Sequence, residues 1–229
     1  MGQMTVQQVA ALILPIALVP SMAWCFRAFS RRFGSQLGYL LGFVVYWVVW
    51  CTLAPLILLG GMQPLMSLFR PFVALNTLSW IIQLLLWWPV VFPLLFAFVP
   101  RIKKASASVV VVSVLLGILI GVTEEVLWRG VYTRLFPSST FLALIYPSVM
   151  FGLWHIAPLA IMPNRKPGGT LSFVAYAVVL GITYAVAARL TGSIAWCTIA
   201  HAVHDTLGLG GFAYAHWLTG KCPRNQVPA

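Results

Sequence analysis

Long apolar runs with almost no charge recur along this chain and constrain its fold more than any other feature. Each run is close to the roughly 20 residues that an α-helix needs to cross about 30 Å of hydrocarbon. Hydrophobic residues make up 61% of the chain and charged residues only 7%, too few to cover a surface that faces water on every side. The sequence therefore predicts an all-α, polytopic membrane bundle of seven or eight transmembrane helices, organised as one integral-membrane domain over residues 1–229.

The turns between the runs place the expected spans. Proline, glycine and charged residues separate one run from the next. The fourth run is either one unusually long helix or a membrane helix followed by a second one. A short apolar run at Phe212–Leu218 is a possible eighth, partial span. The seven full spans are expected at about Thr5–Phe26, Gln36–Leu59, Leu78–Val99, Ser106–Phe136, Phe141–Ile161, Leu171–Leu190 and Ile194–Leu209.

Basic residues give the chain a formal net charge of +11, but they lie in small clusters between the apolar runs. Seven spans place all four clusters on one side, which is typical of the cytoplasmic side of a membrane protein and not of a nucleic-acid-binding surface. We therefore expect a multi-pass protein of the cell membrane, with an outside N-terminus, a cytoplasmic C-terminus and no nucleic-acid partner. The clusters comprise Arg27, Arg31 and Arg32; Arg101, Lys103 and Lys104; Arg165 and Lys166; and Lys221 and Arg224.

All three acidic side chains of the protein lie inside apolar runs. Glu124 and Glu125 are adjacent in the fourth run, and Asp205 follows His201 by four residues in the seventh. Ionisable groups are costly inside a membrane and mark a functional site by default. The acids therefore indicate where function resides.

Helix geometry allows these groups to meet. Glu124 lies about 13 residues before the turn that follows the fourth run, and His155 about 15 residues after it. At 1.5 Å per residue, both are roughly 20 Å from the same hairpin end. His201 and Asp205 lie about 12 and 18 Å below the turn that ends the sixth span, on the same face. A shared cluster is thus geometrically allowed.

Spacing within each helix divides the two glutamates. Glu125 and Arg129 stand at positions i and i+4, as do His201 and Asp205, so each pair can interact across one turn. Glu124 points about 100° away from Glu125. One carboxylate can therefore be held by Arg129 while the other faces a cavity.

The residue types fit hydrolysis of an amide. A carboxylate in a poorly solvated pocket is suited to act as a general base for water, and a neighbouring histidine can share the proton and orient that water. Donors on another helix can stabilise a tetrahedral oxyanion. Glu124, His155 and His201 together supply such groups.

Three short motifs carry these residues. Glu124–Arg129 reads EEVLWR and matches EExxxR, Phe151–His155 matches FxxxH, and His201–Asp205 matches HxxxN/D. In this order, on membrane helices, they resemble the CPBP family of CAAX prenyl proteases, bacteriocin-processing proteins and abortive-infection proteins. The resemblance spans about residues 106–210 as a catalytic core, and residues 1–105 contribute additional membrane helices.

The resemblance implies a metal-independent intramembrane endopeptidase with no cofactor. It would act within the lipid bilayer on a peptide or protein substrate with a membrane-proximal or lipid-modified segment. By analogy, Glu124 with His155 would activate the attacking water, and His201 with Asp205 would stabilise the oxyanion. The same analogy gives a site-shaping role to Glu125 and Arg129.

Position 205 departs from the asparagine form of its motif. Asparagine can donate a hydrogen bond to an oxyanion, whereas an ionised aspartate only accepts. Asp205 must therefore be protonated, orient His201, or bind a cationic group.

Other functions remain open from the sequence. The chain could be a non-catalytic membrane immunity or scaffold protein, or a transporter that uses the Glu–His–Asp set as a proton relay. Glu124, His155 and His201 are also of ligand types that suit zinc, although the chain has no HExxH motif.

The remaining polar residues of the runs have simpler interpretations. Cys197 lies one turn before His201, which allows a cysteine nucleophile, but an unactivated thiol in apolar surroundings is inert. His204 and His216 are interpreted as hydrogen-bonded packing residues, and Arg134 and Arg189 as topology determinants.

Overall fold

A computed structural model describes residues 3–162 and 168–208 of the chain. This part is built of helices and contains no strand, and six of its helices are long and apolar enough to cross a membrane. The predicted all-α polytopic bundle is thereby confirmed. The six candidate spans are Val6–Phe33, Ser35–Leu59, Trp80–Arg101, Ala107–Leu135, Phe141–Leu159 and Gly169–Thr191.

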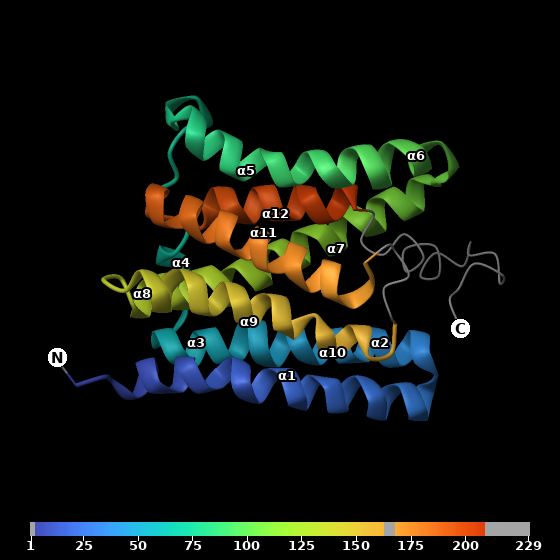
Figure 1. Cartoon of the computed structure of the whole chain (residues 1–229), viewed down its shortest axis with the longest axis horizontal. Coiled ribbons are helices and arrows are strands. Elements are labelled where there is room, and N and C mark those ends of the chain that lie inside the picture. The colour runs from blue at the N-terminus through green and yellow to red at the C-terminus, as the bar shows by residue number, and fades with distance from the viewer. Residues whose placement is uncertain (1–2, 163–167, 209–229) are drawn as a thin grey trace.

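Successive spans run antiparallel in Figure 1, and several change helical type along their length. The fourth expected run is one continuous helix of 29 residues, which decides between the two alternatives for it. The α-helical elements are α1 (Val6–Phe33), α2 (Ser35–Val45), α3 (Ala54–Leu59), α4 (Met62–Ser67), α5 (Trp80–Pro93), α6 (Val99–Arg101), α7 (Ala107–Glu125), α8 (Tyr132–Leu135), α9 (Tyr146–Trp154), α10 (Ile156–Leu159), α11 (Gly169–Thr191) and α12 (Ala195–Leu207). Segments of π-helix at Tyr46–Leu53, Leu94–Phe98, Val126–Val131 and Phe141–Ile145 join or precede these elements.

The seventh expected span corresponds to α12, which has 13 residues. At 1.5 Å per residue it is about 20 Å long, shorter than the hydrocarbon core of a bilayer. Helix α12 lies inside the bundle, packed against α7 and α5. The possible eighth span at Phe212–Leu218, His216 and two of the basic clusters lie outside the described residues. These clusters are Arg165 with Lys166, and Lys221 with Arg224.

Local sequence explains where the helices begin and end. Thr5 forms a capping box with Gln8 at the start of α1, and the Ser106 side chain accepts a hydrogen bond from the backbone N–H of Val109 at the start of α7. Such caps satisfy backbone donors that a helix start leaves free. Gly192 ends α11 with a φ of 69°, a left-handed conformation that glycine adopts without steric cost.

Two glycines of α7 bring α12 close to the acidic residues. A Cβ atom on Gly121 would lie 2.7 Å from the backbone nitrogen of Ala202, and one on Gly117 would overlap the Thr206 hydroxyl. Small residues at a membrane helix interface let the backbones approach closely. This contact sets α12 directly beside the part of α7 that carries Glu124 and Glu125.

Gly121→Val is expected to destabilise the protein by about 1–3 kcal/mol, the usual cost of overpacking a tight interface. Its thermal unfolding midpoint in detergent should fall relative to wild type. Val122→Leu is the matched control, because Val122 is the next residue of α7 and its side chain is exposed on the outer surface. Equal midpoints for the two variants would contradict the proposed close packing of α7 on α12.

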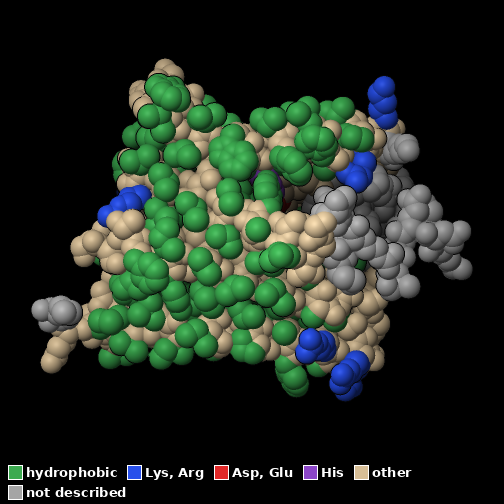
Figure 2. Space-filling view, viewed as in Figure 1, with side chains coloured by type: hydrophobic (Ala, Val, Ile, Leu, Met, Phe, Trp, Pro, Cys, Tyr) green, Lys and Arg blue, Asp and Glu red, His purple; other side chains and the backbone are tan. Residues whose placement is uncertain are grey.

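The outer surface separates charge from apolar side chains. Figure 2 shows Lys and Arg side chains at the two ends of the visible face, with a hydrophobic band between them. Many large apolar side chains of the spans are exposed, including Trp24, Ile57 and Leu171. Such a band is what a helical bundle presents to lipid tails.

Candidate active site

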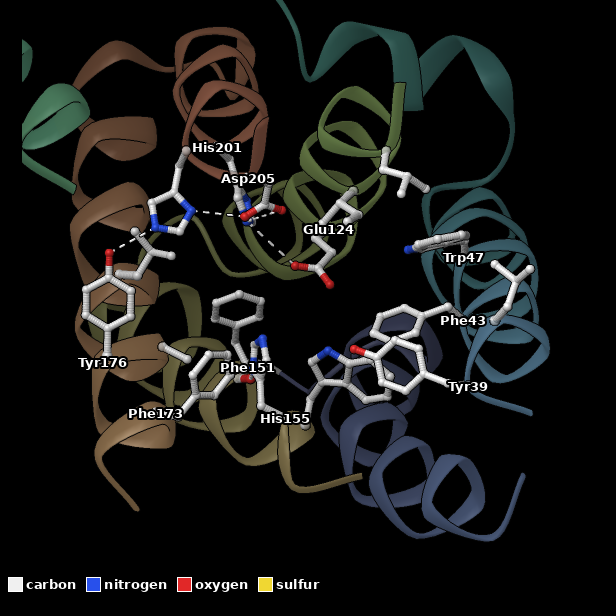
Figure 3. A pocket seen from close by; sticks show the side chains of 17 residues that line it. Tyr39, Phe43, Trp47, Glu124, Phe151, His155, Phe173, Tyr176, His201 and Asp205 are labelled. Atoms are coloured by element: carbon white, nitrogen blue, oxygen red, sulfur yellow. Dashed lines mark hydrogen bonds and ion pairs between the residues drawn. The ribbon is translucent and has the colours of Figure 1, made fainter. Parts of the chain in front are cut away.

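A cavity of about 240 Å³ lies within the bundle, and all four predicted catalytic residues line it. Glu124, His155, His201 and Asp205 come from α7, the α9–α10 junction and α12, and the labelled side chains converge on one space in Figure 3. The shared cluster expected from helix depth is therefore present. The complete lining comprises Tyr39, Leu40, Phe43, Trp47, Leu116, Ile120, Glu124, Phe151, Trp154, His155, Phe173, Tyr176, Ala177, Leu180, His201, His204 and Asp205.

The two adjacent glutamates lie where α7 gives way to a π-helical segment. Single π-turns inside longer helices are frequent at functional sites. The structure gives Glu124 and Glu125 different surroundings: Glu124 lines the cavity, whereas the Glu125 carboxylate lies 3.1 Å from the Arg129 guanidinium. Both members of this ion pair are buried. The expected pairing at positions i and i+4 is therefore observed.

Aromatic rings enclose the Arg129 guanidinium. Its central carbon lies 4.5 Å from the centroid of the Phe151 ring and 5.8 Å from that of the Tyr184 ring. A cation over an aromatic face is stabilised by the negative charge density of the ring. Arg129 thus holds Glu125 from a fixed position and joins the first motif to the second, which contains Phe151.

His201 is oriented by Glu125, a contact that the sequence analysis did not anticipate. The Nδ1 atom of His201 lies 2.7 Å from Glu125 Oε1. Because an ionised carboxylate only accepts hydrogen bonds, we assign the proton of this bond to Nδ1. The other ring nitrogen, Nε2, then faces Glu124 Oε2 at 3.8 Å and Asp205 Oδ2 at 3.7 Å. Both separations exceed a direct hydrogen bond, so this nitrogen faces two carboxylates without being bonded to either.

His155 is held by its own backbone and by aromatic rings. Its Nδ1 lies 2.8 Å from the Phe151 carbonyl oxygen; the carbonyl can only accept, so Nδ1 donates. The ring packs against Phe151 and Phe173, with centroids 4.8 and 5.3 Å away. Nε2 is thereby left as the nitrogen available for chemistry. Within the described residues His155 forms no ion pair with Glu124; the two side chains share the cavity, and the nearest histidine nitrogen to Glu124 belongs to His201.

A hydrogen-bonded chain reaches Asp205 from the opposite wall of the cavity. His204 Nδ1 lies 3.0 Å from Asp205 Oδ1, and its Nε2 lies 2.9 Å from the Tyr176 hydroxyl oxygen. The carboxylate fixes the proton on Nδ1, so Tyr176 donates to Nε2. His204 is hydrogen-bonded as expected, but its interpretation as a packing residue is incomplete, since it lines the cavity. Its position next to Asp205 in the third motif is the sequence feature that could have indicated a place in the site.

One wall of the cavity is aromatic, and sequence reasoning did not identify it. Tyr39, Phe43 and Trp47 stand at successive i and i+4 positions of the second span and line the cavity together. Opposite them lie Phe173 and Tyr176 from α11, as Figure 3 shows. Aromatic residues are common throughout this chain, so spacing alone did not separate a cavity wall from a lipid-facing stripe.

The contacts of Cys197 and the grouping of possible metal ligands bear on the two alternative chemistries, a cysteine nucleophile and a zinc site. Cys197 is buried, its thiol donates to the Tyr184 carbonyl oxygen at 3.2 Å, and it is not among the residues that line the cavity. Among the described residues, no three His, Cys, Asp or Glu side chains are grouped so as to hold a metal ion. Glu124, His155 and His201 therefore share a cavity without forming a compact ligand set.

The fold and the cavity define a multi-pass membrane protein with a buried carboxylate–histidine site. Residues 106–207, a little under half of the chain, match the family model described as type II CAAX prenyl endopeptidase Rce1-like. The match extends from the residue before α7 to the end of α12 and includes all three motifs. The resemblance to the CPBP and CAAX protease family is thereby confirmed. Comparison with curated proteins and with solved structures finds no match.

Proposed function

We propose that the protein is an intramembrane endopeptidase that hydrolyses a peptide bond in a membrane-proximal or lipid-modified substrate without a metal ion. The observation that carries the proposal is the division of the glutamates. Glu125 is occupied by Arg129 and His201, whereas Glu124 faces a cavity that contains two histidines with defined hydrogen bonds. A buried carboxylate that is not used in the ion pair is a candidate catalytic base.

In the proposed reaction, Glu124 takes a proton from a water molecule bound in the cavity. The unprotonated Nε2 of His155 accepts the second hydrogen of this water and orients its attack. General base catalysis of this kind contributes about 10²–10⁴-fold to a rate. The attack forms a tetrahedral intermediate on the scissile carbonyl, and Glu124 returns its proton to the leaving amine.

His201 supplies the donor for the developing oxyanion. Glu125 holds the Nδ1 proton and favours the imidazolium form, whose Nε2–H can donate toward the cavity. Asp205 lies 3.7 Å from that nitrogen and adds to the stabilisation of the imidazolium. We therefore assign Asp205 to orienting His201, with the chain from Tyr176 through His204 as its support. Donors aimed at an oxyanion in a poorly solvated site are strong contributors to catalysis.

The shape of the cavity suggests how a substrate enters. Tyr39 and Phe173 lie close to the starts of α2 and α11, so the cavity extends from Glu124 toward the end of the bundle that carries Arg31 and Arg101. We place this end on the cytoplasmic side of the cell membrane, following the positive-inside rule. The aromatic walls fit an apolar or lipid-modified segment of the substrate.

The test is to compare protein processing in host cells that lack this protein with that in cells complemented by wild type. A membrane-associated protein should accumulate uncut in the deletion cells and be cleaved again on complementation. Terminal peptides identified by mass spectrometry then define the cleavage site. Complete processing of all membrane proteins without this chain would contradict the proposed function and favour a non-catalytic immunity or scaffold role.

His155→Ala is expected to abolish this processing while the variant still accumulates in membranes. The substitution removes the proposed water-orienting nitrogen but leaves the Glu125–Arg129 pair intact. Val149→Ala is the control, since Val149 lies on the same helix with its side chain exposed on the outer surface. Processing by His155→Ala at the wild-type level would exclude a catalytic role for this histidine.

Strong chelators should leave cleavage by the purified protein unchanged. The proposed mechanism uses only carboxylate and imidazole groups, so no step of it depends on a divalent ion. The measurement is the cleavage rate before and after chelation, followed by addition of Zn²⁺. Loss of activity that zinc restores would replace the glutamate mechanism with a metal-assisted one.

A further inference from the structure

A second cavity, of about 600 Å³, lies at the opposite end of the bundle from the basic clusters near α6 and the α1–α2 turn. Three arginines line it, Arg70, Arg134 and Arg189. They come from the loop after α4, from α8 and from the last turns of α11. Three guanidinium groups from separate parts of the chain therefore surround one space.

Among the described residues, no carboxylate pairs with these three arginines. The protein has three acidic side chains, and Glu124, Glu125 and Asp205 all lie at the first site. Within residues 3–162 and 168–208, none of the three arginines forms a hydrogen bond or an ion pair. All three side chains are exposed, so water screens their mutual repulsion, but they remain free to bind an external anion together.

The other polar groups of the cavity already have partners. The Ser193 hydroxyl donates to the Leu68 carbonyl oxygen at 3.4 Å, and the Thr133 hydroxyl donates to the Arg129 carbonyl oxygen at 2.7 Å. A backbone hydrogen bond of 2.9 Å from Ile194 to Leu68 fixes the loop that precedes Arg70 against the start of α12. The donors left for a ligand are guanidinium N–H groups, which match the oxygen atoms of a phosphate.

Helix-end electrostatics explain the arginines only in part. Arg134 and Arg189 lie in the last turns of α8 and α11, where a cation interacts favourably with the helix dipole. Arg70 lies in a loop, outside any helix, and this effect does not draw three cations to one cavity.

We propose that this cavity binds the phosphate of an anionic phospholipid headgroup. Its residues lie at the ends of membrane-spanning helices, the level at which headgroups lie. Exposed apolar side chains adjoin the arginines: Leu190 follows Arg189, and Phe72 lies two residues after Arg70. These side chains would contact the acyl chains below the headgroup. The inference is independent of the proposed peptidase activity.

The test measures lipid binding to the delipidated full-length protein in detergent by native mass spectrometry. Short-chain phosphatidylglycerol and phosphatidylcholine are titrated against wild type, the triple variant Arg70→Gln/Arg134→Gln/Arg189→Gln, and the control triple variant Arg31→Gln/Arg32→Gln/Arg101→Gln. The two triple variants lose the same charge. Wild type and the control triple variant should bind one phosphatidylglycerol molecule tightly. They should bind phosphatidylcholine about tenfold more weakly.

Each single substitution in the arginine cavity should weaken phosphatidylglycerol binding about tenfold, or about 1.4 kcal/mol. The single variants keep the test decisive if the triple variant does not fold. Equal binding of phosphatidylglycerol by the two triple variants would contradict the proposed binding site. Equal binding by wild type and every single variant would contradict it as well. Inorganic phosphate alone is the second arm: if it raises the thermal midpoint of wild type as much as phosphatidylglycerol does, the lipid assignment is wrong and a free phosphate is the ligand.

Discussion

Replacing Glu124 with Gln is expected to abolish processing of the substrate while the variant accumulates in membranes at the wild-type level. Glutamine keeps the size and one hydrogen-bonding oxygen of the side chain but cannot take a proton from water, so the loss should be about 10²–10⁴-fold. Glu124 is not part of the Glu125–Arg129 ion pair, and its carboxylate lies 3.8 Å from His201 Nε2, beyond a direct hydrogen bond, so the thermal midpoint should change little. The measurements are the fraction of substrate cleaved in complemented cells and thermal unfolding of the purified variant.

A drop in both quantities would mean that Glu124 has a structural role. A Glu124→Gln variant that processes substrate as well as wild type would exclude it as the catalytic base. Thr123→Val is the neighbouring control, because Thr123 precedes Glu124 on α7 and its hydroxyl only donates back to helix carbonyl oxygens. Thr123→Val should retain processing.

Replacing Glu125 with Gln should instead cost both stability and cleavage. The substitution leaves the Arg129 guanidinium buried without its carboxylate, and breaking a buried ion pair from one side costs about 3–5 kcal/mol. It also weakens the hydrogen bond that orients His201. The thermal midpoint in detergent should therefore fall well below that of Glu124→Gln, although the two glutamates are adjacent.

The double variant Glu125→Gln/Arg129→Met separates these two effects. Removing both charges abolishes the unpaired-cation penalty, so much of the lost stability should return. Cleavage should stay low, because His201 still lacks its ionised partner. Recovery of full cleavage in the double variant would show that Glu125 acts only through Arg129 and that its contact with His201 is unimportant for the reaction.

Apolar runs predicted most of the fold because membrane helices must satisfy their backbone hydrogen bonds internally. Six expected spans coincide with helices long enough to cross a membrane. Composition could not show that α12 is a 13-residue helix packed inside the bundle, since a buried helix and a lipid-facing one are both apolar. The glycines at positions 117 and 121 determine this packing, and a glycine reveals its partner helix only in three dimensions.

Helix spacing predicted part of the site, namely the Glu125–Arg129 pair and a common depth for Glu124, His155 and His201. It could not predict that Glu125 also contacts His201, because that contact depends on the rotation of α12 relative to α7. The Tyr176–His204–Asp205 chain was missed for a similar reason, since it joins residues of two helices. Spacing along one helix shows which of its own residues share a face. It does not show how the neighbouring helix is rotated about its axis.

The most direct test of the central claim uses purified protein in lipid vesicles together with the membrane-associated substrate that accumulates uncut in deletion cells. The rate of peptide-bond cleavage is measured for wild type and for Glu124→Gln reconstituted at equal amounts. If Glu124 is the base that activates water, wild type cleaves the substrate at the site found in cells and Glu124→Gln does so at least about 10²-fold more slowly. Equal cleavage by the two proteins would contradict this account, as would the absence of cleavage by wild type.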